Sequence, residues 1–374
     1  MSRVAVIHPW LPHYRVQFFA DLAAQLATED IELSVLHGDP PLGVRARGDA
    51  SGLDWACRLP SRQLRLGSRE LTLKRLPPDL RSCDLVIVEQ AIRNLETYEL
   101  LARSTVSGRR LALWGHGRTY TRPHSALHEG LKQFLTRRGS WFFSYTSGGA
   151  RHVVRHGFDP DRVTVVNNSL DTRELSRRVE ETTPAEARQA AAELAVNPAS
   201  TCLFVGGLDE SKRLEFLLAA GERISRAIPD FALLVAGDGT QRALVERAAE
   251  STRWLRYVGR ADAVVKARLA AVSRLMLMPG AIGLVAVDSF VLGTPVVTTA
   301  WPLHGPESEY LQPDWNAVIT PDDSRTYADT VAELLRQPAL LDTLRSRCWE
   351  AAADHTLEQM VQNFAGGVRA ALVT

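Results

Sequence analysis

The sequence predicts an α/β protein built from two doubly wound domains, and three observations carry that prediction. Short apolar segments of strand length alternate with amphipathic helical segments along the chain. The alternation stops near residue 171 and starts again near residue 201. The length of 374 residues exceeds what one typical core uses. Apolar strands joined by helices are typical of parallel sheets that are covered on both faces.

The predicted elements fall into two comparable halves. In the first half the expected strands are 4–7, 32–37, 84–89, 110–114, 141–146 and 162–166, and the expected helices are 16–27, 97–104 and 125–137. Between 171 and 200 an Arg/Glu/Ala-rich stretch that includes TTPAEARQAAAEL marks the linker and an opening helix. In the second half the expected strands are 202–205, 231–236, 256–258, 275–278 and 296–298, and the further expected helices are 213–226, 241–250, 264–271, the segment around Asp288, 324–336, 338–355 and 357–372. We therefore expect a first domain over 1–170, a second over 171–355, and a final helix over 356–374 that packs back on the first domain.

The composition excludes several classes of protein. Hydrophobic residues make up 45% and charged residues 23%, which is typical of a globular chain and not of a disordered or fibrous one. No apolar run approaches the roughly 20 residues of a membrane-spanning helix, and the apolar run 4–7 is too short for a signal peptide. The four cysteines lack CxxC spacing, so we expect reduced, mostly buried thiols in a cytoplasmic protein.

The net charge of +1 hides a difference between the two halves. Residues 1–180 contain 26 Lys+Arg and 19 Asp+Glu, whereas the remainder contains 18 and 24. A basic first half can indicate an anionic partner, such as the inner face of a membrane. It can also reflect a general arginine bias, because only four of the 44 basic residues are lysine. No nucleic-acid-binding motif is present, and aromatic residues are not interleaved with the basic ones, so nucleic acid is not an expected partner.

Three segments place glycines where a strand runs into a helix, which is where backbone N–H groups can bind an anion. The first is VGGLDESKR (205–213), in which Gly206 and Gly207 precede Lys212 at the start of a helix. Glycines let a ligand approach the backbone, and a lysine adds positive charge to the helix dipole. The combination suits a diphosphate, although an ordinary loop with an exposed lysine would have the same pattern.

The second segment is VAGDGTQRALVERA (235–248), with Gly237 and Asp238 after a strand. Asp238 could cap the following helix or contact a ligand. The third glycine of a GxGxxG fingerprint is absent, so a nicotinamide cofactor is not expected. The third segment, MPGAIGLVAVD (278–288), has a Pro-Gly turn before a helix that carries Asp288 about two turns in. Asp288 could reach sugar hydroxyls beside a bound anion.

Polar side chains also follow strands of the first half. His116 in WGHGR (114–118) comes directly after a strand and lies between two glycines, where open α/β sheets bind ligands. The loop after the first strand contains His13, Tyr14 and Arg15 as candidate contacts for an acceptor or a phosphate. For both segments the alternative is a structural loop with solvated side chains.

Two further candidates follow the strand 296–298. His304 and Glu307 lie in the segment HGPE, and Glu307 could supply a carboxylate to the cleft or lie on the surface. The chain has no HExxH or clustered Cys and His ligands, no GxSxG elbow and no P-loop. We therefore expect neither a metal nor a bound cofactor.

Taken together, these segments resemble the retaining GT-B glycosyltransferases of family 4. The second half carries the resemblance in VGGLDESKR, VAGDGTQRALVERA, YVGRADAVVKARLAAVSRLMLMPG and AIGLVAVDSFVLGTPVV, in this order and spacing. The first half adds WGHGR, FFSYTSGGARHVVRHGF and VVNNSLD, and the segments HPWLPHYRVQFFADLA, DLVIVEQ and PLHGPESEYL are similar to a surface-polysaccharide subset of the family. The resemblance covers essentially the whole chain.

The resemblance implies a GT-B fold, in which two Rossmann-like domains face each other across a cleft, and a nucleotide-diphosphate sugar as co-substrate. Lys212 would bind the diphosphate, Asp288 would hold the ribose, and His116 would approach the transferred sugar. The anomeric configuration would be retained without a protein nucleophile or a metal, and the leaving diphosphate would help to deprotonate the acceptor hydroxyl. The residues implied in donor binding are Gly206, Gly207, Lys212, Gly237, Asp238, Gly259, Arg260, Gly280, Ala281, Ile282, Gly283, Leu284 and Asp288.

The sequence departs from the family pattern at three places. The family carries two glutamates separated by seven residues, where this chain has Gly280 and Asp288. The arginine that accompanies the family's lysine is replaced by Gly207, and the glycine pair of the first loop is replaced by residues 12–15. The residues that could restore the missing charges are Arg15, Arg118 and Arg260 for the cation and Glu307 for the carboxylate.

We therefore expect a transferase that glycosylates a saccharide, lipid-linked or small-molecule acceptor in polysaccharide biosynthesis, with the basic half against an anionic membrane. Two alternatives remain. A catalytically weak sugar-nucleotide-binding protein would account for Gly207 and Gly280, and a GT-B sugar-nucleotide epimerase would need further acid–base carboxylates. The residues expected on the acceptor side or in auxiliary roles are His13, Tyr14, Arg15, Arg118, His304 and Glu307.

Overall fold

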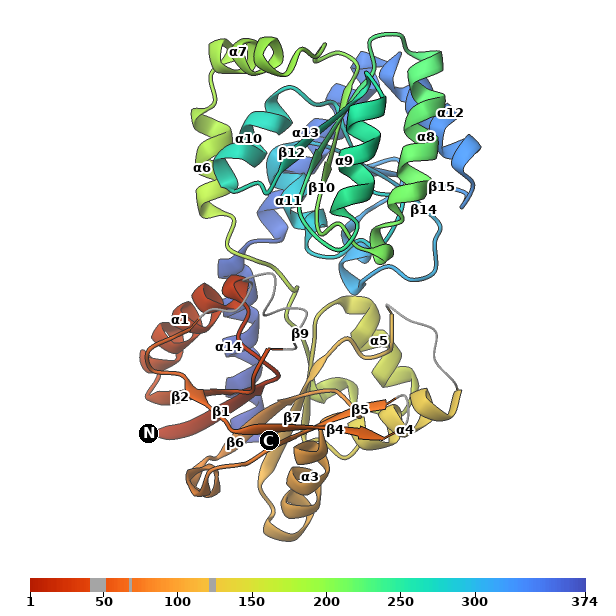
Figure 1. The fold of residues 1–374 in the computed structure, drawn as a ribbon. Coiled ribbons are helices and arrows are strands. Elements are labelled where there is room, and N and C mark those ends of the chain that lie inside the picture. The colour runs from red at the N-terminus through yellow and green to blue at the C-terminus, as the bar shows by residue number, and fades with distance from the viewer. Residues whose placement is uncertain (41–51, 67–68, 121–125) are drawn as a thin grey trace. The chain divides into compact units, whose positions relative to one another are not determined.

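The computed structural model of the protein describes residues 1–40, 52–66, 69–120 and 126–374. The chain divides into two compact units (Figure 1). The first unit contains Met1–Asp171 together with Leu357–Thr374, and the second contains Thr172–Thr356. Each unit has its own parallel sheet with helices packed on it, so the predicted pair of doubly wound α/β bodies is confirmed.

The first unit is built on a seven-stranded parallel sheet in the order β3-β2-β1-β6-β7-β8-β9. Its strands are β1 (Ser2–His8), β2 (Ile31–His37), β3 (Cys57–Arg58), β6 (Leu85–Glu89), β7 (Arg110–Gly115), β8 (Trp141–Ser144) and β9 (Val163–Val165). Successive residues of β1 point to opposite faces, so Val4 and Val6 join one core whereas Ala5 and Ile7 join the other. Burial on both faces explains why this strand is apolar throughout.

One core of the first unit combines segments that are far apart in the sequence. The helices of this unit are α1 (His13–Ala27), α3 (Leu95–Ser107), α4 (Ala126–Thr136), α5 (Ser147–Arg155) and α14 (Leu357–Val373), with 3₁₀ turns η1 (Pro78–Ser82) and η2 (Pro160–Arg162). Figure 1 shows α14, in blue, beside α1, in red. Phe364 of α14 stacks on Phe143 with ring centroids 4.4 Å apart and meets Phe18 and Trp114 at 5.4 and 5.0 Å.

An antiparallel hairpin that the sequence did not predict follows β3 in the chain. It consists of β4 (Ser61–Leu66) and β5 (Arg69–Lys74). Lys74 Nζ lies 2.5 Å from Oε1 of Glu96 on α3, and the two side chains are only 1% and 2% exposed. The backbone N–H of Lys74 donates to the other oxygen of Glu96 over 3.3 Å. This buried ion pair joins the hairpin to α3.

The second unit is built on a six-stranded parallel sheet in the order β12-β11-β10-β13-β14-β15. Its strands are β10 (Thr201–Val205), β11 (Ala232–Ala236), β12 (Leu255–Gly259), β13 (Leu275–Leu277), β14 (Val296–Thr299) and β15 (Ala317–Thr320). The chain adds β11 and β12 on one side of β10 and then returns to add the remaining strands on the other side. This reversal places a topological switch point between β10 and β13, where open α/β sheets bind ligands beyond the carboxyl ends of the strands.

Helices and short 3₁₀ turns connect the strands of the second unit. They are α6 (Arg173–Glu181), α7 (Pro184–Leu194), η3 (Glu210–Lys212), α8 (Leu214–Ala227), α9 (Arg242–Ser251), α10 (Ala263–Ala271), α11 (Val285–Leu292), η4 (Pro306–Tyr310), α12 (Ser324–Leu335) and α13 (Pro338–Asp354). The helix α11 is buried along most of its length and ends at Gly293, whose φ of 59° is the left-handed conformation that favours glycine. A buried helix after β13 fixes the position of the turn that precedes it.

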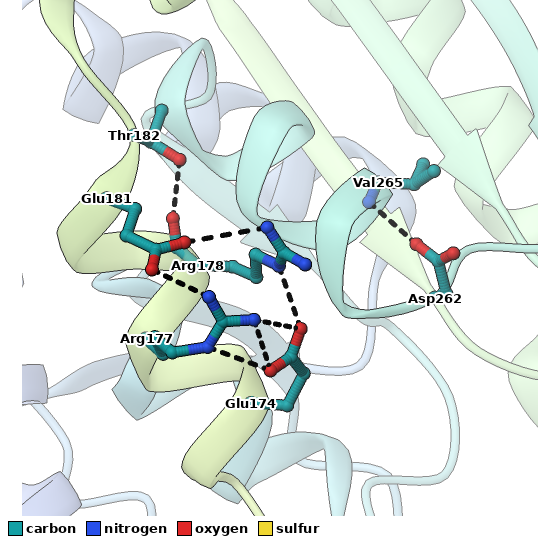
Figure 2. A network of polar contacts seen from close by, with 7 residues as sticks. All are labelled: Glu174, Arg177, Arg178, Glu181, Thr182, Asp262 and Val265. Atoms are coloured by element: carbon teal, nitrogen blue, oxygen red, sulfur yellow. Dashed lines mark hydrogen bonds and ion pairs between the residues drawn. The ribbon is translucent and has the colours of Figure 1, made fainter.

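Charged side chains of α6 form a network on the surface of the second unit (Figure 2). Arg177 and Arg178 both pair with Glu174 and Glu181 over 2.6 to 3.5 Å. Each of these side chains is more than a third exposed, so the pairs contribute little to stability. A pocket of about 290 Å³ lies beside this network between α6, α7 and α10, and none of the predicted site residues lines it.

Some elements differ from the sequence prediction. The helix α1 begins at His13 because Pro12 takes the N-cap position, so His13–Arg15 form its first turn and not a loop. The strands β3 and β15 and the helices α5 and α6 were not predicted. Among the cysteines, Cys202 and Cys348 are buried, but Cys57 is exposed, contrary to the expectation of mostly buried thiols.

No helix within the described residues is both long enough and apolar enough to span a bilayer.

Candidate functional site

The candidate site lies at the switch point of the second unit, where the turns after β10 and β13 meet. Ala281 donates its backbone N–H to the carbonyl of Ser211 over 2.8 Å. The ammonium group of Lys212 donates in turn to the carbonyl of Ala281. These reciprocal bonds hold the segment 279–284 against η3. The two glycine-containing turns that the sequence singled out are therefore adjacent in space.

Gly280 is required by the close approach of these two turns. A Cβ atom at this position would lie 2.4 Å from the carbonyl oxygen of Ser211 and 2.5 Å from the carbonyl carbon of Lys212. Both contacts are with backbone, so a side chain could not be added without moving η3. Position 280 is where the resembled family carries its first glutamate. In this chain the backbone of η3 fills the space that a side chain at this position would need.

Arg213 and Thr299 hold the start of the same turn. The Arg213 guanidinium donates to the carbonyl of Pro279 over 3.2 Å and pairs with Asp322 over 2.5 Å. Thr299, at the end of β14, donates its hydroxyl to the carbonyl of Pro279 over 3.1 Å. Side chains from two other elements therefore position the turn before α11.

His304 is a positioning residue in this arrangement. Its Nδ1 accepts the backbone N–H of Ile282 over 3.2 Å, so its Nε2 carries the proton and donates to the carbonyl of Thr299 over 2.8 Å. Burial lowers the pKa of His304. The neutral imidazole fits both bonds, whereas protonation of Nδ1 would remove the acceptor for Ile282.

The helix α11 offers backbone donors at this turn. The N–H groups of Gly283, Leu284 and Val285 have no hydrogen-bond acceptor in the described part of the chain, and these residues are partly exposed. Unpaired N–H groups at a helix N-terminus carry partial positive charge and bind anions. Lys212 adds a full charge beside them. Burial lowers the pKa of Lys212, whereas the nearby carboxylates of Asp209 and Glu307 raise it.

Glu307 is the carboxylate that lies against this turn. Its side chain is 5% exposed, and its Oε2 would be 3.8 Å from a Cβ on Gly283 and 3.2 Å from a Cβ on Gly305. Gly305 donates its N–H to the carbonyl of Ile282 over 2.6 Å. The segment that carries Glu307 is therefore bonded directly to the turn before α11.

Asp288 is buried in the first turn of α11 and not about two turns in as predicted, because the helix begins only at Val285. It forms an ion pair that the sequence did not predict. Its Oδ2 lies 2.6 Å from Nζ of Lys266 on α10. Its Oδ1 is buried and has no hydrogen-bond partner among the described residues. A buried carboxylate oxygen without a donor can accept a ligand hydroxyl. Lysine is rare in this chain, and Lys266 and Lys212 are two of only four, so that rarity was an available signal.

The ends of β10, β11 and β12 form the other side of the site. Gly206 donates to Ala236, Leu208 donates to Asp238, and Gly237 donates to Gly259, over 2.7 to 3.1 Å. A Cβ on Gly237 would lie 1.9 Å from the carbonyl oxygen of Gly206, so only glycine permits this approach.

Asp238, Gly207 and Arg260 complete this side. Asp238 accepts the N–H of Gly239 over 2.8 Å, whereas α9 begins after Gln241, so Asp238 caps the turn and not the helix. Gly207 lies beside the Asp209 carboxylate, with 3.1 Å between a Cβ and that oxygen. Arg260 is exposed just after β12.

Arg15 links the predicted residues of the first unit, because its guanidinium lies 5.2 Å from the ring centroid of Tyr14 and 5.6 Å from that of Tyr145. His13 and Tyr14 are exposed on the first turn of α1, with ring centroids 5.9 Å apart. His116 is exposed after β7, and its ring lies 4.5 Å from that of Tyr145. Desolvation by the surrounding atoms lowers the pKa of His116.

Arg118 and Arg15 differ in exposure. Arg118 is exposed, with its guanidinium 4.3 Å from the ring centroid of Tyr120. Arg15 is 2% exposed and bonds to Asn168 and to the carbonyl of Ser169. Aromatic rings surround its guanidinium, including that of Trp114 at 5.3 Å. Arg15 therefore holds the first unit together and does not present its charge at the surface.

The chain is similar in sequence to known glycosyltransferases. The family described as "Glycosyl transferases group 1" matches residues 199–337. Glycogen synthase of Mycobacterium tuberculosis is 24% identical over 306 residues, which is 76% of this chain and 67% of that protein. The family match contains both turns of the candidate site.

Solved structures share the fold over nearly the whole chain. A glycosyltransferase from Rickettsia africae has a TM-score of 0.68 at 12% identity, covering 99% of this chain and 98% of its own. HepE from Anabaena, solved in complex with UDP and glucose, has a TM-score of 0.67 at 14% identity, covering 99% and 100%. The fold is that of the GT-B proteins. Together with the family match, it supports a glycosyltransferase of the GT-B type.

Proposed function

We propose that the protein transfers a sugar from a nucleotide-diphosphate sugar to a saccharide, lipid-linked or small-molecule acceptor in polysaccharide biosynthesis. The observation that carries the proposal is that the N–H groups of residues 283–285, beside Lys212 at the switch point, have no acceptor among the residues that the structure describes. Helix N-termini with an adjacent lysine bind diphosphates. The second unit would hold the donor and the first unit the acceptor.

Each donor group has a partner in this proposal. The diphosphate binds the N–H groups of α11 and the ammonium of Lys212, which has donors beyond the one used by Ala281. The ribose hydroxyl donates to Oδ1 of Asp288, which has no donor among the described residues. Glu307 takes over the sugar hydroxyls that the family's first glutamate binds, because η3 leaves no room for a side chain at Gly280.

We propose that the reaction proceeds with retention of the anomeric configuration, as the resemblance to family 4 implies. The leaving diphosphate accepts the proton of the acceptor hydroxyl as the glycosidic bond to the donor breaks and the new one forms on the same face. Lys212 and the helix N-terminus stabilise the charge that develops on the diphosphate. This charge stabilisation needs no metal, so we expect a chelator to leave the rate unchanged.

Arg118, His13 and Tyr14 are the exposed polar residues of the first unit that we propose for the acceptor side, and we propose that His116 approaches the transferred sugar. His116 follows β7 directly, at the edge where such sheets bind ligands. Replacing His116 by Ala is expected to lower the transfer rate and to change binding of the nucleoside diphosphate little, because the proposed diphosphate and ribose contacts all lie in the second unit. An unchanged transfer rate would remove His116 from the catalytic site.

A thermal-shift panel of nucleotide sugars tests the donor site. A ligand that binds only the folded protein raises its melting temperature, so the donor is identified by a selective rise. Asp288→Asn and Lys212→Ala are each expected to weaken binding about tenfold or more, because each removes a charged hydrogen-bond partner. Asp342→Asn is the matched control, since Asp342 is also ion-paired but lies 65% exposed on α13. An unchanged shift in Asp288→Asn would contradict the ribose assignment.

The products separate the proposal from its alternatives. Transfer to an acceptor, with the anomeric configuration read by NMR, supports the transferase. Tight donor binding without transfer or hydrolysis would instead identify a sugar-nucleotide-binding protein, which Gly207 and Gly280 would allow. Conversion of the donor into its epimer without an acceptor would identify an epimerase.

A further inference from the structure

The helix α4 of the first unit exposes a stripe of apolar side chains. Leu127, Leu131 and Phe134 recur at i, i+4 and i+7, and they are 87%, 42% and 44% exposed. The buried side chains of the helix are polar, namely Lys132, Gln133 and Thr136, and Leu135 is half-buried against the core beside them. A helix on the surface of a globular protein normally buries its apolar face.

Hydrogen bonds fix this orientation of α4. Gln133 donates through Nε2 to the carbonyl of Gly117 over 2.7 Å. Gln90 donates to the hydroxyl of Thr136 over 2.7 Å, and it also accepts the N–H of Gly117 over 3.0 Å. Rotating α4 to bury Leu127, Leu131 and Phe134 would leave these buried polar groups without partners, at a cost in stability. The apolar stripe is therefore held outward by the fold.

The sequence around the stripe is strongly basic. Residues 118–158 contain seven Lys+Arg and a single acidic residue, Glu129. Glu129 accepts from Gln133 over 2.7 Å, and its carboxylate lies 3.4 Å from His152 on the neighbouring helix α5. Arg137 is exposed at the end of α4.

Arg138 packs on the last apolar side chain of the stripe, Phe134. Its guanidinium lies 4.5 Å from the ring centroid of Phe134, so a cation is stacked on an exposed apolar side chain. Arginine can place its stem along an apolar surface while its charged end stays in water. The stripe thus ends in positive charge.

We propose that α4 is a docking surface for an anionic lipid bilayer. Leu127, Leu131 and Phe134 would enter the boundary between headgroups and acyl chains, and Arg137 and Arg138 would contact the anionic headgroups. An apolar helix face bordered by basic residues is the chemistry that such a surface recognises. A second copy of the chain is disfavoured, because a symmetric contact would bring two basic surfaces together. The proposal does not depend on the proposed function, since its test reads binding and not activity.

Co-sedimentation with vesicles tests the docking surface. The full chain is expected to bind vesicles of phosphatidylcholine mixed with phosphatidylglycerol and to bind pure phosphatidylcholine much more weakly. Leu131→Glu is expected to lower the partition coefficient about tenfold, because it replaces an inserted side chain by a charge. Leu340→Glu is the matched control, since Leu340 is a similarly exposed leucine (39%) on α13, and it is expected to bind as the parent does.

The charge contribution is tested separately. The double variant Arg137→Gln/Arg138→Gln is expected to lower partitioning onto anionic vesicles about tenfold or more, because each basic residue near such a surface contributes several-fold. The control Arg247→Gln/Arg325→Gln removes two exposed arginines of the second unit and is expected to have no effect. Far-UV circular dichroism and melting curves confirm that each variant is folded.

Three results would overturn the proposal. The first is equal binding to the anionic and the neutral vesicles, and the second is no binding to either. The third is a fall in particle mass by light scattering in Leu131→Glu, which would show that a second copy covers α4.

Discussion

The two units share one plan but differ at the carboxyl ends of their strands. In the second unit, glycine turns leave the N–H groups of residues 283–285 beside Lys212 without an acceptor in the described part of the chain. In the first unit, large side chains fill the end of β1, where His8 and Arg15 both lie against the ring of Trp114. Topology therefore fixes where a ligand can bind, and side-chain volume decides whether the position is open.

Among the tests of this difference between the two units, the largest effect is expected from the buried charges of the first unit. Replacing Lys74 by Met leaves the Glu96 carboxylate buried without its partner, and we expect a loss of about 3–5 kcal/mol in the free energy of unfolding. Urea denaturation measures the loss. The double variant Lys74→Met/Glu96→Leu removes both charges and is expected to recover most of the stability. A destabilisation of the double variant equal to that of Lys74→Met would show that packing, and not charge, is responsible.

His8 adds a pH dependence to the first unit. Burial lowers its pKa from 6.5 to about 4. The unfolded chain therefore binds a proton at His8 before the folded one does, so this stabilisation is complete above pH 6.5 and is lost as the pH falls towards 4. We expect it to amount to about 3 kcal/mol.

His8→Gln isolates this effect. The difference in stability between the parent and the variant is expected to shrink as the pH falls from 6.5 to 4. A constant difference across this range would contradict the assignment to His8.

The turn of the second unit is tested through its glycines. Gly280→Ala places a Cβ within 2.5 Å of the η3 backbone, and we expect about 1–3 kcal/mol of destabilisation together with loss of donor binding. Gly283→Ala is the matched control, because its Cβ would meet only the Glu307 carboxylate at 3.8 Å. Thermal melting with and without the donor compares the two variants. Equal destabilisation by both would show that close approach is not the cause.

The smallest effect is expected at the α6 surface network. Arg177→Ala removes exposed pairs with Glu174 and Glu181, and we expect a change below about 1 kcal/mol that disappears at high salt. Urea denaturation at two salt concentrations measures it. A loss as large as that in Lys74→Met would break the contrast between buried and exposed charge.

The fold could be predicted well from the sequence because both sheets are parallel and buried. Runs such as LVIVE in β6 and ALLVA in β11 are apolar at nearly every position, and the alternation of strands and helices follows from them. The hairpin β4–β5 was missed because SRQLRL and RELTLK mix charged and apolar residues, and its anchor, Lys74–Glu96, joins residues from different elements.

The candidate site could be predicted only in part. Its location follows from glycines after strands, and the turns around Gly206 and Gly280 do meet the segment that carries Lys212. The ion pair between Lys266 and Asp288 depends on how α10 packs against α11, which a periodic pattern does not encode. The burial of Arg15 likewise depends on α14 and on the segment 168–169, both distant in the chain.

The helix α14 also bears on the order in which the protein can fold. During synthesis, the second unit is complete before α14 leaves the ribosome, because α14 follows it in the chain. Until then the first unit exposes the aromatic side chains that later surround Phe364, namely Phe18, Trp114 and Phe143. Nascent domains usually finish in the order of synthesis. Here the first unit is translated first but completes its core last. Until then, its exposed aromatic side chains form the surface that a chaperone would protect.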